Sequence, residues 1–235
     1  MVDVHHVHRH RNVQGGAARA AVFGVSDGLV SNVGLILGVA AASPASKTVL
    51  VAGVAGLLAG AFSMAAGEYV SVKAQAELVE RELAIERVSI RDSPEAELNE
   101  LSSIYRSRGV PPETARTLAQ SIMADPEVAL EVHAREEMGI DPDSVGNPVE
   151  AAASSLVAFS IGASLPLLPW LFSEGTVAIV LSLLVGLCVA AAVGLTIAFF
   201  TERSKIRTTL RQVSLAAATC AVTWVVGSAV GSAVL

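Results

Sequence analysis

The sequence predicts an all-α polytopic membrane protein with five transmembrane helices. Hydrophobic residues make up 52% of the 235 residues and charged residues only 16%, and the mean hydropathy is +0.58. The apolar residues gather in continuous runs of about 20 residues, the length at which a helix crosses the roughly 30 Å hydrocarbon layer. Because these runs do not alternate apolar with polar residues, they lack the pattern of barrel strands.

The expected spans fall into two groups, separated by a polar segment. The first group occupies residues 20–70 and the second residues 151–235. In order, the spans are residues 20–42, 49–70, 152–172, 176–200 and 213–235. Only Asp27 and Glu68 are charged inside them. A charged side chain in hydrocarbon is costly and usually faces an ion path or a packed interior, so both residues are candidates for function.

Three of the spans contain glycines four residues apart, a spacing that lets helix backbones approach closely. The pairs are Gly34 with Gly38, Gly56 with Gly60, and Gly227 with Gly231. We expect these faces to mark helix contacts, either within one chain or between two copies.

Lysine and arginine residues predict the orientation of the chain, because they are enriched in the cytoplasmic loops of membrane proteins. They precede the first span, follow the second and recur four times in residues 201–212, whereas Lys47 is the one basic residue of the opposite loops. The N-terminus is therefore expected in the cytoplasm and the C-terminus outside. Residues 1–19 are expected to be a cytoplasmic tail, and we interpret its HHVHRHR stretch as a basic tail rather than a metal site.

Residues 71–150 are expected to form a small cytoplasmic helical domain. They carry 17 of the 22 acidic residues and 8 basic ones, a net charge of −9. No Pro or Gly interrupts residues 71–92, so the second span should continue out of the bilayer as one long helix. Ser93-Pro94, Gly109-Val-Pro-Pro and Asp125-Pro126 are typical helix starts. The pattern predicts a bundle of three or four helices joined to the second span.

Acidic residues of this insert recur three or four positions apart, which places two side chains on one helix face. The pairs are Glu82 with Glu86, Glu97 with Glu100, Glu127 with Glu131, and His133 with Glu137. Carboxylates with an imidazole suit Fe²⁺ and Mn²⁺ better than the thiolate sets that suit zinc or Cu(I). The alternative is a solvated acidic surface on which Arg81, Arg87 or Arg135 neutralises several glutamates.

Within the membrane, Met64 lies one helical turn before Glu68, so these two side chains and Asp27 could line one path. For each residue an ordinary structural role is the alternative. The Asp27 carboxylate could hydrogen-bond to Ser26, Ser31 or Asn32 of its own helix, or cap a break at Gly28. Glu68 could be hydrated near the cytoplasmic end of its span, and Met64 could fill space between helices.

The sequence favours a protein that is not an enzyme. It contains no nucleotide-binding loop, GxSxG elbow or HExxH motif, and no prosthetic group is expected. The acidic insert gives no basis for nucleic-acid binding. Cys188 and Cys220 lie in expected spans and are interpreted as packing residues.

Three stretches make the chain similar to the vacuolar iron transporter family, which includes eukaryotic vacuolar iron carriers and their bacterial relatives. They are GVSDGLVSNVGLILGVA around Asp27, AGLLAGAFSMAAGEYVSVKAQAE around Met64, and PLLPW in the third span. The similarity extends over nearly all of the chain from about Arg19. It implies a proton-coupled exporter of Fe²⁺, and often of Mn²⁺, that works as a homodimer with its ion path between the subunits.

The resemblance also implies roles for individual residues. Asp27 and Met64 match the metal ligands of the family's pore. The glutamates of the family's cytoplasmic metal-binding domain match, in this chain, Glu86, Glu97, Glu100 and Glu137.

Three positions depart from the family's pattern. Gly56 stands where vacuolar members carry a further pore glutamate, and Ser89 stands in place of a glutamate on the long helix. His133 replaces a methionine of the insert and is a candidate nitrogen ligand. With the pore glutamate missing, Asp27 and Glu68 are the candidates for proton coupling.

The expected function is export of Fe²⁺, Mn²⁺ or both from the cytosol by proton antiport, in the service of iron and manganese homeostasis and detoxification. The metal is then cargo, and the expected partners are divalent metal ions, protons, the lipid bilayer and a second copy of the chain. The expected location is a bacterial plasma membrane. The alternatives are a carrier for another divalent cation, such as Ca²⁺, Zn²⁺ or Ni²⁺, and a membrane metal sensor or scaffold that transports nothing.

Overall fold

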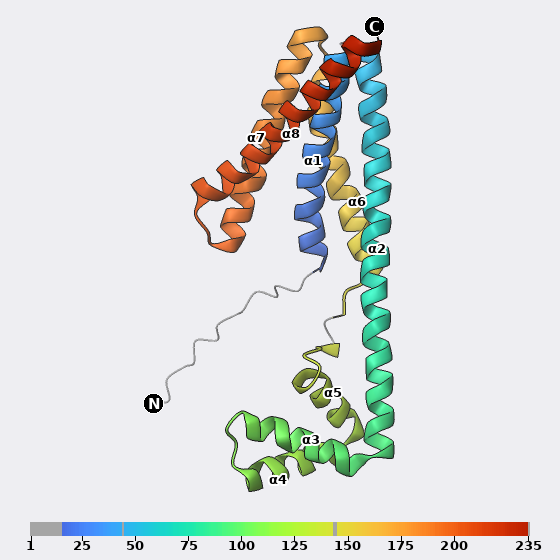
Figure 1. The fold of residues 1–235 in the computed structure, drawn as a ribbon, viewed down its shortest axis with the longest axis vertical. Helices are drawn as coiled ribbons and strands as arrows, with labels where there is room; N and C mark the ends of the chain where they lie inside the picture. Colours follow the sequence, from blue (N-terminus) through green and yellow to red (C-terminus); the bar gives the residue numbers. More distant parts are fainter. Residues whose placement is uncertain (1–15, 44, 143–144, 235) are drawn as a thin grey trace, which may run out of the picture. The chain divides into compact units, whose positions relative to one another are not determined.

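In the computed structural model, the chain is helical and has no strand among the residues described, which are all except 1–15, 44, 143–144 and 235 (Figure 1). The elements in chain order are α1 (Gly16–Ala42), α2 (Ser46–Asp92), α3 (Pro94–Ser107), α4 (Pro112–Met123), α5 (Pro126–Glu136), α6 (Pro148–Ser164), the 3₁₀ helix η2 (Leu165–Leu171), α7 (Gly175–Thr201) and α8 (Lys205–Val234). The predicted all-α fold is confirmed. Most of the expected tail at residues 1–19, with its histidines, lies outside the described residues.

Among the described residues, five helices are long and apolar enough to cross a membrane, as the sequence predicted. They are Ala20–Ala42, Ser46–Asp92, Pro148–Leu171, Gly175–Thr201 and Lys205–Ala233. The last helix begins at Lys205 and not near residue 213, because its basic first turns are also helical, although their polar residues fall outside the apolar run that predicted the span. The third span is not α-helical to its end. It changes to a 3₁₀ helix at Leu165, where Pro166 and Pro169 remove backbone donors.

The chain divides into two compact units, one of residues 1–70 with 148–235 and one of residues 71–147. In the first unit, α1 packs against α6, α7 and α8. Two glycines bring α1 and α6 together: a Cβ on Gly28 would lie 2.3 Å from the carbonyl oxygen of Phe159, and one on Gly162 would lie 2.2 Å from that of Val25. Such close approach through small residues is how membrane helices gain packing contacts without a hydrophobic driving force.

The glycine pairs of the first and last spans lie in the contact between α1 and α8 within one chain. A Cβ on Gly227 of α8 would lie 1.9 Å from the carbonyl oxygen of Gly38 of α1, and one on Gly231 would lie 2.7 Å from the Cα atom of Ala42. The third pair faces a different neighbour, since Gly60 of α2 packs against the ring of Phe159.

The second unit contains the last part of α2 with α3, α4 and α5 (Figure 1). Its small apolar core is formed by Ile90, Ala129 and Leu130, with Leu83, Ile122 and Met123 against it. The expected helix starts are all present. The Asp125 carboxylate caps α5 by accepting hydrogen bonds from the backbone N–H groups of Glu127 at 3.0 Å and Val128 at 3.4 Å. Ser93 occupies the N-cap position of α3, but its side chain makes no capping hydrogen bond.

The contact between α1 and α8 generates a test of the fold. Replacing Gly227 by Ala places a methyl group against the backbone of Gly38, so we expect the variant to lose about 1–3 kcal/mol of stability. Thermal unfolding in detergent measures the loss. Gly67→Ala is the matched control, since no described atom lies within 4 Å of the added methyl group. Equal melting temperatures for the two variants would contradict the contact.

Candidate metal sites

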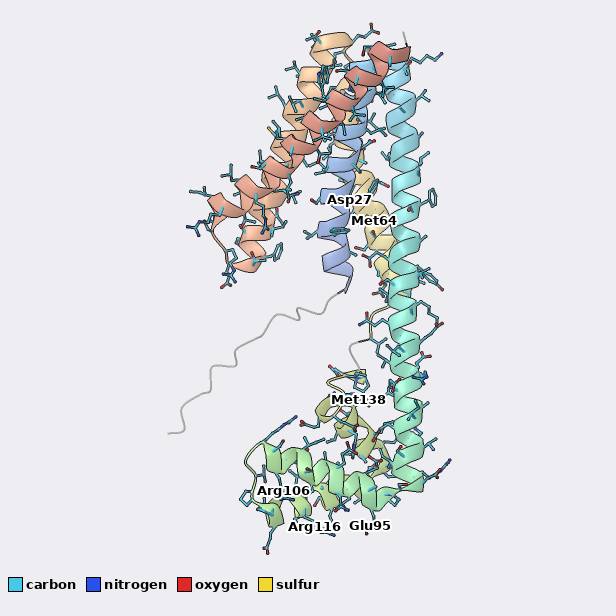
Figure 2. All side chains as sticks on the ribbon, in the orientation of Figure 1. Asp27, Met64, Glu95, Arg106, Arg116 and Met138 are labelled. Carbon is cyan, nitrogen blue, oxygen red and sulfur yellow. The ribbon has the colours of Figure 1, made fainter. Side chains whose placement is uncertain are left out.

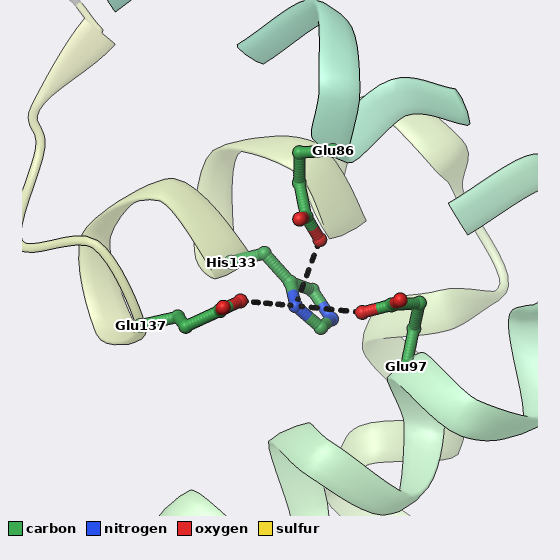
Figure 3. Close-up of side chains that lie close together, drawn as sticks. All are labelled: Glu86, Glu97, His133 and Glu137. Carbon is green, nitrogen blue, oxygen red and sulfur yellow. Dashed lines mark ion pairs between the residues drawn. The ribbon is translucent and has the colours of Figure 1, made fainter. Parts of the chain in front are cut away.

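His133 of α5 lies at the centre of a group of carboxylates in the second unit (Figure 3). Its Nδ1 atom is 3.2 Å from Oε1 of Glu86, 3.7 Å from Oε2 of Glu97 and 3.6 Å from Oε2 of Glu137. One potential ligand atom from each of the four residues lies within 4.8 Å of the other three. The group therefore offers oxygen and nitrogen donors around one small volume.

Three helices supply these four side chains. Glu86 lies near the end of α2, Glu97 is in the first turn of α3, and His133 and Glu137 are one turn apart at the end of α5. The turn at Ser93 and Pro94 ends α2 and starts α3, which brings Glu86 and Glu97 to the same place. His133 is fully buried, and Glu86 and Glu97 are almost so. Such burial of three polar side chains distinguishes the group from an ordinary acidic surface.

The electrostatics of this group are unfavourable in the absence of a cation. Burial, and then the negative charges of Glu97, Glu137 and Glu100, raise the pKa of Glu86 from its ordinary value of 4.5 to about 7. Burial is also the main cause of a raised pKa at Glu97. Neither ring nitrogen of His133 has a hydrogen-bond partner among the described residues. A divalent cation would relieve the charge repulsion and would give one ring nitrogen of His133 a partner.

Three other glutamates that the sequence suggested as metal ligands form ion pairs with arginines instead. Glu82 pairs with Arg81 at 2.6 Å, Glu127 pairs with Arg87 at 3.8 Å, and Glu131 pairs with Arg135. Glu100 is exposed and lies outside the four-residue group, although its charge is among those that raise the pKa of Glu86. The structure therefore brings together Glu86, Glu97, His133 and Glu137 of the expected ligands, and leaves Glu100 at the surface.

The residues present fit a divalent transition metal. Imidazole nitrogen and carboxylate oxygen bind such ions at about 2.0–2.2 Å, so ligand atoms on opposite sides of one ion are about 4 Å apart. The four atoms, within 4.8 Å of one another, reach that spacing with small side-chain movements. The arrangement can hold one ion with three oxygens and one nitrogen.

Figure 2 labels Asp27 of α1 and Met64 of α2 in the first unit. Both residues line one open pocket of about 320 Å³. Its walls come from α1, α2 and α6, and its lining residues are Asp27, Ser31, Asn32, Leu35, Gly56, Gly60, Ser63, Met64 and Phe159. Asp27 is exposed and Met64 half-buried. A carboxylate and a thioether from two different helices thus share one space within the membrane spans.

The polar neighbours of Asp27 make their hydrogen bonds elsewhere. The Ser31 hydroxyl donates to the backbone carbonyl of Asp27 at 2.6 Å, and the Asn32 amide donates to the carbonyl of Ala163 at 2.7 Å. Neither of these two hydrogen bonds involves the Asp27 carboxylate, whose residue lines the pocket. Glu68 is half-buried and is not among the residues that line this pocket.

Sequence reasoning gave Asn32 only a structural role and did not name Ser63. Both line the pocket, and Asn32 is 2% exposed. A strongly polar amide in an apolar span is the signal that could have singled out Asn32, because such residues in membranes are usually functional or paired. Ser63 carries no comparable signal, since serine is common at helix contacts.

The fold and this pocket define an integral membrane protein with five helical spans and a carboxylate-containing cavity among them. Comparison with known sequences then places it more closely. The chain belongs to the VIT family, whose sequence profile matches residues 18–228. The resemblance seen in the sequence is thereby confirmed.

Several relatives are named vacuolar iron transporters. One from Acanthamoeba castellanii is 41% identical over 162 residues, which are 68% of this chain and 58% of that protein. Vacuolar iron transporter 1 of Oryza sativa subsp. japonica is 32% identical over 169 residues, 72% of this chain and 67% of the relative. Vacuolar iron transporter 1 of Eucalyptus grandis is 28% identical over 219 residues, 93% of this chain and 88% of the relative. The chain thus spans about three fifths of the amoebal protein and most of the eucalyptus one.

His133 gives the most direct test of the site in the second unit. Because its ring is the one nitrogen donor of the group, we expect His133→Ala to weaken Mn²⁺ binding by the purified full chain at least about tenfold. Competition with a chelating dye measures the affinity. Glu127→Gln is the control, since this exposed side chain pairs with Arg87 outside the group. Equal affinities of the two variants would rule out His133 as a ligand.

The raised pKa of Glu86 predicts how this affinity depends on pH. Below about pH 7 the metal-free site holds a proton on Glu86, and a metal ion has to displace it. We therefore expect the apparent affinity for Mn²⁺ to fall as the pH is lowered from about 8 to about 6. Glu86→Gln should bind more weakly but with a shallower pH dependence, whereas Glu82→Gln should keep the wild-type profile. If Glu86→Gln kept the wild-type dependence of Mn²⁺ affinity on pH, Glu86 would not be the group that causes it.

Proposed function

We propose that this protein is a metal ion transporter that moves Fe²⁺, Mn²⁺ or both out of the cytosol in exchange for protons. The observation that carries the proposal is the pocket shared by Asp27 and Met64 among the membrane spans. An ionisable side chain at that depth is expensive to maintain and is usually part of an ion or proton path. The names of the relatives, all vacuolar iron transporters, support iron as a cargo.

The chemistry of the pocket suits a soft-to-borderline divalent ion. The carboxylate of Asp27 supplies charge and a hard oxygen donor, and the Met64 thioether supplies a soft donor that Ca²⁺ and Mg²⁺ do not favour. A carboxylate can hold either the metal ion or a proton. Exchange at Asp27 is therefore the simplest device for coupling the two fluxes.

The carboxylates around His133 serve as a collecting site for the cargo in this proposal. A site with three carboxylates and an imidazole binds divalent metal from a dilute solution and raises its local concentration. Because burial and the neighbouring carboxylates raise the pKa of Glu86 to about 7, protons compete with metal ions for this site near neutral pH, which favours reversible binding.

The proposal includes a homodimer whose second copy completes the ion path. The pocket is open, with Asp27 exposed at its edge. Beside it, α1 presents two apolar side chains that its own unit leaves partly uncovered, Phe23 one helical turn before Asp27 and Leu35 in the lining of the pocket. A second copy placed over this face would bury the apolar side chains and enclose Asp27 and Met64 in a shared cavity.

Asp27 provides the test of this function. Asp27→Asn keeps the shape of the side chain but removes its charge, so we expect Fe²⁺ and Mn²⁺ transport into proteoliposomes to fall to the level of protein-free vesicles. The elution volume and melting temperature should stay unchanged. Glu174→Gln, which removes an exposed carboxylate outside the pocket, is the control and should transport normally. Unimpaired flux in Asp27→Asn would defeat the proposal and favour a sensor or scaffold.

Glu68 tests the proton part of the proposal separately. If Glu68 joins Asp27 in coupling, Glu68→Gln should reduce the dependence of metal flux on a pH gradient while leaving some downhill flux. A pH-sensitive dye inside the vesicles reports proton movement. Full proton coupling in this variant would leave Asp27 as the coupling residue. Running Ca²⁺, Zn²⁺ and Ni²⁺ in the same assay identifies the cargo among divalent ions.

A further inference from the structure

Asn32 of α1 is a buried polar side chain with only one end bonded. It is 2% exposed, and its Nδ2 atom donates to the carbonyl oxygen of Ala163 at 2.7 Å. Its Oδ1 atom is buried and accepts no hydrogen bond from any described residue. An unmet buried oxygen of this kind is costly and calls for a partner that the protein itself does not supply. Asn32 also lines the pocket of Asp27 and Met64.

The change from α6 to the 3₁₀ helix η2 explains which end of the Asn32 side-chain amide faces Ala163. The carbonyl of Ala163 lies at the end of α6, just before the 3₁₀ helix η2. Three residues further on is Pro166, which has no N–H to offer. The Asn32 amide supplies a donor in its place, and only the nitrogen end of an amide can do so. The oxygen end is therefore left to face the pocket.

Gly56 of α2 provides the space in front of that oxygen. A Cβ at position 56 would lie 3.2 Å from Oδ1 of Asn32 and 2.3 Å from Cδ2 of Leu35. Any side chain there would compete for the volume next to the amide oxygen. Because position 56 is glycine, no Cβ occupies the volume beside the buried oxygen, and Gly56 and Asn32 both line the pocket that Asp27 also lines.

We propose that the Oδ1 atom of Asn32 is a second oxygen ligand of the transported ion, acting with Asp27 and Met64. This inference rests on the proposed transport function. An amide oxygen is a neutral donor, so the ion would meet one carboxylate, one carbonyl and one thioether from each copy of the chain. Because Asn32 adds coordination without adding charge, it strengthens binding while leaving only the Asp27 charge for the departing ion to overcome.

The experiment compares variants that separate the oxygen from the amide nitrogen. Asn32→Ala removes both, whereas Asn32→Asp keeps an oxygen and loses the donor to Ala163. We expect Asn32→Ala to raise the KM for Fe²⁺ in proteoliposomes about tenfold and Asn32→Asp to keep a KM at or below that of the wild type. Ser182→Ala is the matched control. Buried Ser182 donates to the carbonyl of Pro166 at 2.7 Å, so its loss damages the same helix break without touching the pocket.

A second readout keeps the test decisive if a variant transports poorly for other reasons. Mn²⁺ should raise the melting temperature of the wild type, Asn32→Asp and Ser182→Ala in detergent, and raise that of Asn32→Ala much less. The inference is overturned if Asn32→Ala keeps the wild-type KM and melting shift, if Asn32→Asp is as impaired as Asn32→Ala, or if Ser182→Ala reproduces the defect. Asp27→Asn in the same series tells the two proposals apart: if it still transports, the transport mechanism itself fails, and otherwise only the role of Asn32 is at stake.

Discussion

The close contact between α1 and α6 is the constraint on which the membrane unit depends. At Gly28 and Gly162 the two helices are so near that an added Cβ would meet the opposite backbone at 2.3 and 2.2 Å. Asp27 is the residue before Gly28, and Phe159, which touches Gly28, forms part of the pocket wall. The same contact brings Asn32 to the carbonyl of Ala163. The two glycines therefore fix the positions of Asp27 and Asn32. A larger residue at Gly28 or Gly162 would push α1 and α6 apart and change the shape of the pocket.

In the second unit, charge neutralisation decides which carboxylates remain available to a cation. Glu82, Glu127 and Glu131 each lie beside an arginine, whereas Glu86, Glu97 and Glu137 surround a buried histidine. A nitrogen donor at this centre makes the site harder than one with a methionine sulfur, and it is not subject to methionine oxidation. In the proposed collecting site, the ligand set therefore differs in chemistry from the methionine-containing set that the family resemblance implies.

Hydropathy and helix-start signals were enough to predict most of the fold. Continuous apolar runs predicted the five spans, and the absence of Pro and Gly after the second span predicted the long α2 helix. The change to a 3₁₀ helix at Leu165 and the early start of α8 at Lys205 were missed. The first depends on local backbone donors that Pro166 removes, and the second on polar turns that hydropathy does not count.

The candidate sites were less accessible to sequence reasoning. Spacing shows that Glu82 and Glu86 share a helix face, but it does not show that one meets Arg81 and the other a buried histidine. The orphaned oxygen of Asn32 depends on two contacts distant in sequence, with Ala163 and with the space at Gly56. The partners of these glutamates and of Asn32 are determined by tertiary packing, which cannot be read from the local sequence pattern. The residues matched by resemblance could be named because Asp27 and Met64 sit within distinctive stretches of sequence.

In the proposed mechanism the chain holds its cargo at two separate places, one in the membrane and one around His133. Anomalous scattering at the manganese edge, from crystals of the full chain grown with Mn²⁺, locates bound ions directly. We expect one peak within coordination distance of Asp27 and Met64 and another between Glu86, Glu97, His133 and Glu137. Peaks only at other carboxylates, with neither of these positions occupied, would contradict it.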